Sequence, residues 1–224
     1  MPCDLQQLSA ALNVAASRAT ATVGDDCLRV VIPPLLAAAS SAIQLAGPTG
    51  LELPITIVAL AARNTYEIWL RIRYVIKSSE HCQRWRAENV RDQIQIYEAV
   101  LTLNAPGANK AVISAEIARL EALASAKGLP SVRSPLQARQ LAIEVEAAEE
   151  HDAFYKLYSK LVHPSSWAVN SPSAVGTPMY RAALVANAEL YGRRILECME
   201  ASFNIPVANC LAQATHDGMK HEFH

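Results

Sequence analysis

The segment covering about residues 54–77 constrains the fold more than any other part of the chain. Placed on a helix at about 100° per residue, its apolar side chains cover more than half of the circumference. These residues are Ile57, Val58, Ala61, Ala62, Ile68, Trp69, Ile72, Val75 and Ile76. A helix so widely apolar must be enclosed by neighbours on most sides, so the pattern predicts the central helix of a bundle.

The composition favours an all-α fold. Hydrophobic residues make up 51% of the 224 residues and charged residues 18%, which is typical of a globular chain. Alanine, the best helix former, supplies much of the apolar content, while glycine is sparse and long Val/Ile/Thr alternations are missing. We therefore predict a single all-α domain over residues 1–224, with a C-terminal tail over 204–224.

Capping residues and prolines along the sequence divide the chain into about seven predicted helices. Asp4 and Ser78 stand where capping side chains are preferred, and Ser134-Pro135 and Thr177-Pro178 each place a hydroxyl before a proline at a helix start. The predicted helices cover about 4–22, 28–46, 54–77, 79–103, 110–127, 135–162 and 178–203.

Residues 30–62 form an apolar stretch with a single charge, Glu52. Pro33-Pro34 and Gly47-Pro48-Thr49-Gly50 interrupt it, and each part is shorter than the roughly 20 uninterrupted apolar residues that span a bilayer. We expect buried core helices here and no membrane association. No basic-then-apolar leader is seen at the N-terminus, so the sequence predicts a cytoplasmic protein.

The sequence predicts no metal and no cofactor. The five cysteines form no CxxC pair, and glycine-rich phosphate loops are not found. Near the C-terminus the spacing of acidic residues and histidines fits no established ligand motif. These residues are His216, Asp217, His221, Glu222 and His224.

Charge is balanced overall but uneven along the chain. The net charge of −1 gives no global attraction for nucleic acid. Between residues 63 and 91, however, seven basic residues outnumber three acids, and an acidic run follows at 144–152. Two interpretations stay open: solvated faces of two helices, or a local basic surface for a polyanion.

Arg63, Glu67, Arg71 and Tyr74 form the narrow polar stripe of the helix over 54–77. Their spacing points Arg63 and Glu67 in nearly the same direction. Burying unpaired charges on a central helix would cost free energy. The charges of the stripe must therefore either pair with each other as an intrahelical ladder or line a cleft.

His163 closes the segment Phe154-Tyr-Lys-Leu-Tyr-Ser-Lys-Leu-Val-His163-Pro164-Ser165-Ser166-Trp167. With Lys156 and Lys160 it can complement the negative end of a helix dipole, which requires no substrate. The alternative is chemistry at a helix end, where histidine serves well because it titrates near neutral pH. The long connection that follows has no other charged residue up to Tyr180.

The segments Ala62-Arg63-Asn64-Thr65-Tyr66-Glu67 and Tyr155-Lys-Leu-Tyr158-Ser159-Lys-Leu-Val-His163-Pro164-Ser165 carry a resemblance. Together they resemble a bacterial family of uncharacterised helical proteins with Arg-x-x-x-Glu and Tyr-x-x-Ser-x-x-x-His-Pro-Ser motifs. That family is distantly similar to HEPN helical domains. The resemblance implies a HEPN-like core over about residues 50–203 in a metal-independent ribonuclease of the toxin–antitoxin or phage-defence type. It also implies a homodimer and an antitoxin or regulatory partner.

The resemblance also implies a site that acts on RNA. His163 would be the acid/base, Arg63 or Lys156 would offset charge on the phosphorane, and Tyr158 would position the phosphate. Further binding residues would be Glu67, Arg71, Ser159 and Ser165. The chain departs from the HEPN nuclease motif because no arginine stands four to six residues before the histidine. The alternative is a non-catalytic scaffold or interaction protein, in which Arg63, Glu67 and His163 form a structural polar network.

Overall fold

The computed structural model describes residues 4–47, 53–103, 109–163 and 165–221, with side chains up to His216. Over these residues the chain is all-α, as predicted, and contains eleven helices and no strand. The chain divides into two compact units. Unit 1 consists of residues 1–74 and 138–224, and unit 2 of residues 75–137.

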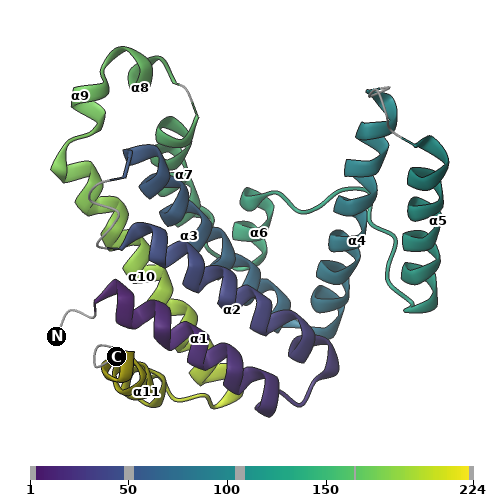
Figure 1. The fold of residues 1–224 in the computed structure, drawn as a ribbon, viewed down its shortest axis with the longest axis horizontal. Helices are drawn as coiled ribbons and strands as arrows, with labels where there is room; N and C mark the ends of the chain where they lie inside the picture. Colours follow the sequence, from purple (N-terminus) through teal and green to yellow (C-terminus); the bar gives the residue numbers. More distant parts are fainter. Residues whose placement is uncertain (1–3, 48–52, 104–108, 164, 222–224) are drawn as a thin grey trace. The chain divides into compact units, whose positions relative to one another are not determined.

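Unit 1 is a helical bundle (Figure 1). Its helices are α1 (Leu5–Thr22), α2 (Asp26–Ala46), α3 (Ile55–Lys77) through Tyr74, α6 (Ala138–Glu144), α7 (Ala148–Val162), α8 (Ser166–Asn170), α9 (Pro172–Val175), α10 (Pro178–Phe203) and α11 (Val207–His221). Helix α1 packs against α2, α10 and α11, and α2 also packs against α10.

The interior of α3 agrees with its sequence pattern. Val58, Ala61, Ala62 and Ile72 are fully buried, and Trp69 is nearly so. A helix with this much buried surface gains most of its stability from packing. The pattern therefore identified a core helix correctly.

Several helix ends follow the predicted capping chemistry. The Asp4 side chain accepts a hydrogen bond from the backbone N–H of Gln6, and Ser78 does the same for His81. Asn204 ends α10 in the left-handed conformation, with φ of 53°. Each device satisfies backbone groups that a helix end leaves unpaired.

The predicted helix over 135–162 is wrong, because the chain breaks it into α6 and α7. Glu146 adopts a φ of 59° between them, a left-handed conformation that a continuous helix cannot contain. The expected cap at Ser134 is also wrong, since α6 begins at Ala138. The pair Ser134-Pro135 predicted a helix start here, but residues 131–137 have no helical backbone.

The predicted tail after residue 204 forms α11 instead. Cys210 and Ala214 are buried, and hydrogen bonds join Gln7 to Thr215 and Arg18 to Gln213 between α1 and α11. The long connection after His163 likewise contains the short helices α8 and α9. Together with the break between α6 and α7, these three helices account for the difference between the seven helices predicted and the eleven in the described part of the chain.

Helix α2 is long and apolar enough to cross a membrane by length and composition, and 44% of its most apolar window is buried inside the structure. Ile32, Leu36 and Ile43 are fully buried in unit 1. A core helix passes the same test of length and composition.

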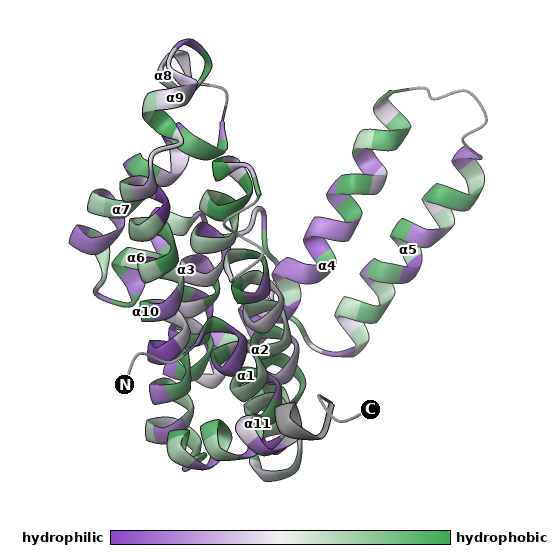
Figure 2. Cartoon of the chain, turned by 60° about the vertical axis from the view of Figure 1, so that its left-hand side comes forward, coloured by the Kyte–Doolittle hydropathy of each residue, from purple (hydrophilic) through white to green (hydrophobic). Residues whose placement is uncertain are grey.

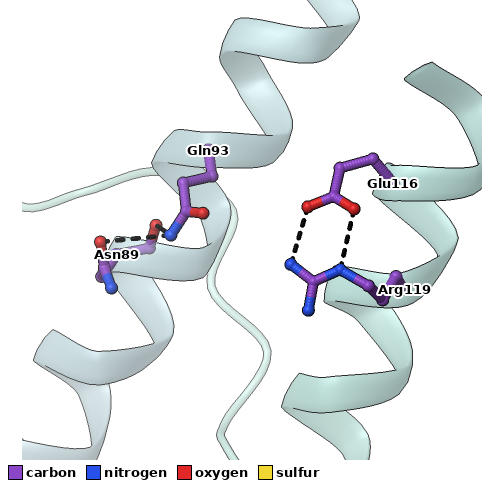
Figure 3. Close-up of polar contacts among 4 residues, drawn as sticks. All are labelled: Asn89, Gln93, Glu116 and Arg119. Atoms are coloured by element: carbon purple, nitrogen blue, oxygen red, sulfur yellow. Dashed lines mark hydrogen bonds and ion pairs between the residues drawn. The ribbon is translucent and has the colours of Figure 1, made fainter. Parts of the chain in front are cut away.

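Unit 2 contains the end of α3, α4 (Ser79–Thr102) and α5 (Lys110–Ala126). Val90, Ile94 and Leu120 form its small apolar cluster. Figure 2 shows hydrophilic and hydrophobic residues interspersed along both helices. Polar pairs occupy the same helices: Glu116 with Arg119 on α5, and Asn89 with Gln93 on α4 (Figure 3).

Glu88 is a buried charge of unit 2, with 0% of its side chain exposed. It accepts hydrogen bonds from Arg84 Nε at 3.1 Å and from the backbone N–H of Leu136 at 3.2 Å. These bonds compensate for its desolvation and join α4 to the segment that leaves unit 2.

We predict that Gly192→Ala destabilises the protein by about 1–3 kcal/mol, because extra atoms in a packed core force its neighbours apart. A Cβ at Gly192 of α10 would lie 2.5 Å from Ile43 Cδ1 and 2.8 Å from Leu8 Cδ2. Urea unfolding measures the loss. Gly24→Ala is the control, since nothing lies within 4 Å of its added Cβ. Equal stability of Gly192→Ala and the native chain would contradict the close packing.

Candidate functional site

Arg63 of α3 joins two helices through two of its three guanidinium nitrogens. Its Nε donates to Glu67 Oε1 at 2.7 Å, and its Nη2 donates to the Tyr155 hydroxyl of α7 at 2.8 Å. The Arg63 side chain is 20% exposed and that of Glu67 32%. Burial acts to lower the pKa of Arg63, but Glu67 and Tyr155 outweigh it and raise the pKa. The group stays charged.

His151 lies beside this contact. Its ring stacks on Tyr155 with centroids 4.5 Å apart, and it is 4% exposed. Its Nδ1 lies 3.3 Å from Asp152 Oδ1, a contact that lowers the pKa of Asp152 together with Arg139. Its buried Nε2 has no hydrogen-bond partner among the described residues.

We call Arg63, Glu67, Tyr155 and His151 the Arg63 cluster. The sequence pattern predicted that Arg63 and Glu67 lie together, but not that Tyr155 and His151 lie beside them. A signal was available: His151 and Tyr155 stand four residues apart, and therefore on one face of α7. The acidic run that surrounds His151 in the sequence obscured this signal.

Aromatic rings pack beneath the Arg63 cluster. The ring centroid of Tyr66 lies 4.8 Å from that of Tyr191 on α10, 5.9 Å from Trp69 and 6.2 Å from Tyr158 on α7. Tyr66, Tyr158 and Tyr191 are fully buried. Burial raises the pKa of each phenol well above its usual value, and the nearby carboxylate of Glu150 adds to the effect.

An ion pair closes the edge of this ring cluster. Arg194 of α10 pairs with Glu150 of α7. Its guanidinium carbon also lies 5.3 Å from the ring centroid of Trp69 and 5.4 Å from that of Tyr191. Cation–ring contacts of this length add to the attachment of α10 to α3 and α7.

His163 lies apart from Arg63 along α7. It caps the C-terminus of the helix, its side chain is exposed, and its backbone N–H donates to the carbonyl of Ser159 at 3.3 Å. Eight residues separate it from Tyr155, the partner of Arg63, which corresponds to about 12 Å of helix rise. No described residue forms a hydrogen bond or ion pair with its imidazole. The structure thus does not bring His163 and Arg63 together in one described network.

Lys156, Lys160 and His163 follow one another at i, i+4 and i+7 on α7, and all three are exposed. We call them the lysine–histidine row. Neither lysine forms an ion pair with a described residue. Tyr158, in contrast, faces the ring cluster and is 0% exposed. It is enclosed by protein, whereas a phosphate-positioning role requires contact with the phosphate.

The remaining predicted binding residues have other surroundings. The Ser165 hydroxyl accepts from the backbone N–H of Ala168 at 3.1 Å and donates to the carbonyl of Lys160 at 2.8 Å. It therefore caps α8 and joins it to the last turn of α7. Ser159 and Arg71 are partly buried. Tyr155 precedes Ser159 by four positions. In the Tyr-x-x-Ser part of the family motif, the tyrosine precedes the serine by three.

Comparison with known proteins identifies the family. A model of a family of unknown function, DUF5677, matches residues 57–173, which is 117 of 224 residues and more than half of the chain. The chain belongs to the DUF5677 family. No curated protein and no solved structure was found to match it. The family match begins in α3 and extends into α9, so it includes the Arg63 cluster and the lysine–histidine row.

No group of three or more potential metal ligands occurs within the described residues. The C-terminal candidates fall largely outside them. His216 is described and exposed, whereas the side chains of Asp217 and His221 and all of Glu222 and His224 lie beyond that part of the chain.

We predict that Tyr155→Phe lowers stability by about 1 kcal/mol, because it removes a hydrogen bond to a charged group that is partly screened by solvent. The matched variant Tyr66→Phe should raise stability by up to about 1 kcal/mol, because the Tyr66 hydroxyl is buried without a hydrogen-bond partner among the described residues. Urea midpoints measure both. Destabilisation of similar size in both variants would contradict this assignment of the two hydroxyls.

We predict that stability falls as pH rises above about 10, the ordinary tyrosine value. Unfolded tyrosines lose their protons there, while Tyr66, Tyr158 and Tyr191 keep theirs because burial raises their pKa. Loss of protons stabilises the unfolded state relative to the folded state, whereas below pH 10 the contribution of the buried phenols is complete. Tyrosinate absorbance should rise together with loss of helical circular dichroism. The Tyr66→Phe/Tyr158→Phe double variant should weaken the pH dependence.

Proposed function

We propose that this DUF5677 chain is a HEPN-like module that cleaves RNA without a metal ion, with His163 as the acid/base. The observation that carries the proposal is the lysine–histidine row, an exposed imidazole at a helix end with two exposed lysines one and two turns before it. Such an arrangement places an imidazole, which can accept or donate a proton, beside cations that attract phosphate. The resemblance to HEPN ribonucleases supports the same assignment.

In this mechanism RNA supplies the nucleophile. His163 removes the proton from a 2′-hydroxyl, or protonates the 5′-oxygen that leaves when the phosphodiester breaks. Lys160 and Lys156 offset the negative charge that develops on the phosphorane. DNA is not cut, because it has no 2′-hydroxyl. Arg63, whose Nε and Nη2 are engaged by Glu67 and Tyr155, holds α3 against α7 and does not contact the phosphate.

A second function is favoured by the Arg63 cluster itself. Two hydrogen bonds of 2.7 and 2.8 Å hold Arg63 to other groups of the protein, which is the arrangement expected of a structural polar network. In this second function, the chain is a non-catalytic scaffold or interaction module. A homodimer and an antitoxin or regulatory partner remain proposals that accompany the HEPN-like assignment.

Cleavage of RNA in EDTA separates the two functions. The native chain should cut a labelled single-stranded RNA, and His163→Ala should lose at least about a hundredfold in rate, since general acid–base catalysis contributes roughly 10²–10⁴-fold. His216→Ala, which removes another exposed histidine, should retain native activity. Circular dichroism confirms that the variants are equally folded.

Two results would reject the ribonuclease assignment. One is no cleavage by any of the three proteins, and the other is equal cleavage by the native chain and His163→Ala. Loss of activity in EDTA alone, restored by Mg²⁺, would reject the metal-independent mechanism.

A further inference from the structure

One end of unit 1 has a distinctive charge. Between Asp152 and Glu189 the sequence contains no acidic residue, although it includes the last two-thirds of α7, all of α8 and α9, and the start of α10. Figure 1 shows these segments together at one end of the bundle. The acids of α7, Glu149, Glu150 and Asp152, lie in its first turns, at the opposite end of the helix. Cations along this stretch are therefore not neutralised by acids of the same segments.

Aromatic rings lie within the same acid-free end. Trp167 of α8 and Tyr180 of α10 contact each other, with ring centroids 5.3 Å apart and planes at 77°. Both rings remain partly exposed. Val169 and Met179 next to them are 62% and 69% exposed, so solvent reaches this part of the surface.

A hydrogen bond connects the rings with the lysine–histidine row. Ser165 donates to the carbonyl of Lys160 at 2.8 Å, and Trp167 follows Ser165 by two residues. Trp167 thus lies within a short distance of the last turn of α7, whose exposed side chains are those of Lys160 and His163.

We propose that this acid-free end binds single-stranded RNA, with bases stacked on Trp167 and Tyr180 and phosphates held by Lys156 and Lys160. Stacking rings next to cations are the usual means of holding single strands, because every base presents an aromatic face. An acidic peptide would pair with the lysines but would not need the rings, and a duplex would bury its base faces. The inference names the ligand class of the proposed ribonuclease site and rests on that proposal for the choice of RNA.

Binding is measured apart from cleavage by fluorescence anisotropy, using a labelled single strand whose 2′-hydroxyls are methylated. The full chain should bind this probe, and Trp167→Leu should weaken binding about tenfold, as expected for the loss of one stacked base. Trp167→Phe keeps a ring and should retain most of the affinity. Both variants keep an apolar side chain at a partly buried position, and circular dichroism checks their folding.

The lysines are tested by salt dependence. Lys156→Gln with Lys160→Gln should reduce the slope of log affinity against log salt by about 1.4, at about 0.7 for each phosphate contact to a single strand. Lys110→Gln with Lys127→Gln is the matched control, because both are exposed lysines in unit 2. That pair should leave the slope unchanged.

The outcomes distinguish this inference from the ribonuclease proposal. Binding that requires Trp167 and the two lysines, without cleavage of ordinary RNA, supports the binding surface and rejects the catalytic assignment. Cleavage that does not depend on these three residues rejects the binding surface. Equal affinity for duplex DNA, for an acidic peptide or for anionic vesicles would also overturn the assignment to single-stranded RNA.

Discussion

Unit 1 depends on the burial of Tyr66 between three helices. Its ring contacts Tyr158 on α7 and Tyr191 on α10, and Val58 and Ala62 of α3 are fully buried on the same helix. The hydrogen bond between Arg63 and Tyr155 needs the two helices to be held at a constant separation. Packing of the rings supplies that condition, because it excludes water and leaves the helices few alternative positions.

This arrangement separates the polar residues of α7 by their position around the helix. His151, Tyr155 and Tyr158 face α3 and the rings, whereas Lys156, Lys160 and His163 face solvent. Charges next to the first face are paired within the protein, since Arg63 pairs with Glu67 and Arg194 pairs with Glu150. Charges on the second face are available to a ligand. We therefore propose the chemistry for the exposed face and a structural role for the Arg63 cluster.

Sequence reasoning was most successful where local chemistry decides the structure. The apolar pattern of α3, the caps at Asp4 and Ser78, and the end of α10 at Asn204 were all predicted, because each depends on side chains a few residues apart. It was wrong at Glu146 and in the segment after residue 204. A left-handed glutamate is rare enough that pattern alone favours a continuous helix, and α11 becomes part of the bundle through its contact with α1.

The sequence by itself determined that the chain is all-α, that α3 lies inside the bundle, and that Arg63 and Glu67 pair along one face of a helix. Those properties depend on periodicity and on neighbours one turn away. Only the tertiary structure decided that Tyr155 and His151 of α7 lie beside Arg63, in place of His163. That choice depends on how α7 is rotated against α3, and the rotation is set by rings from three helices that lie far apart in the sequence.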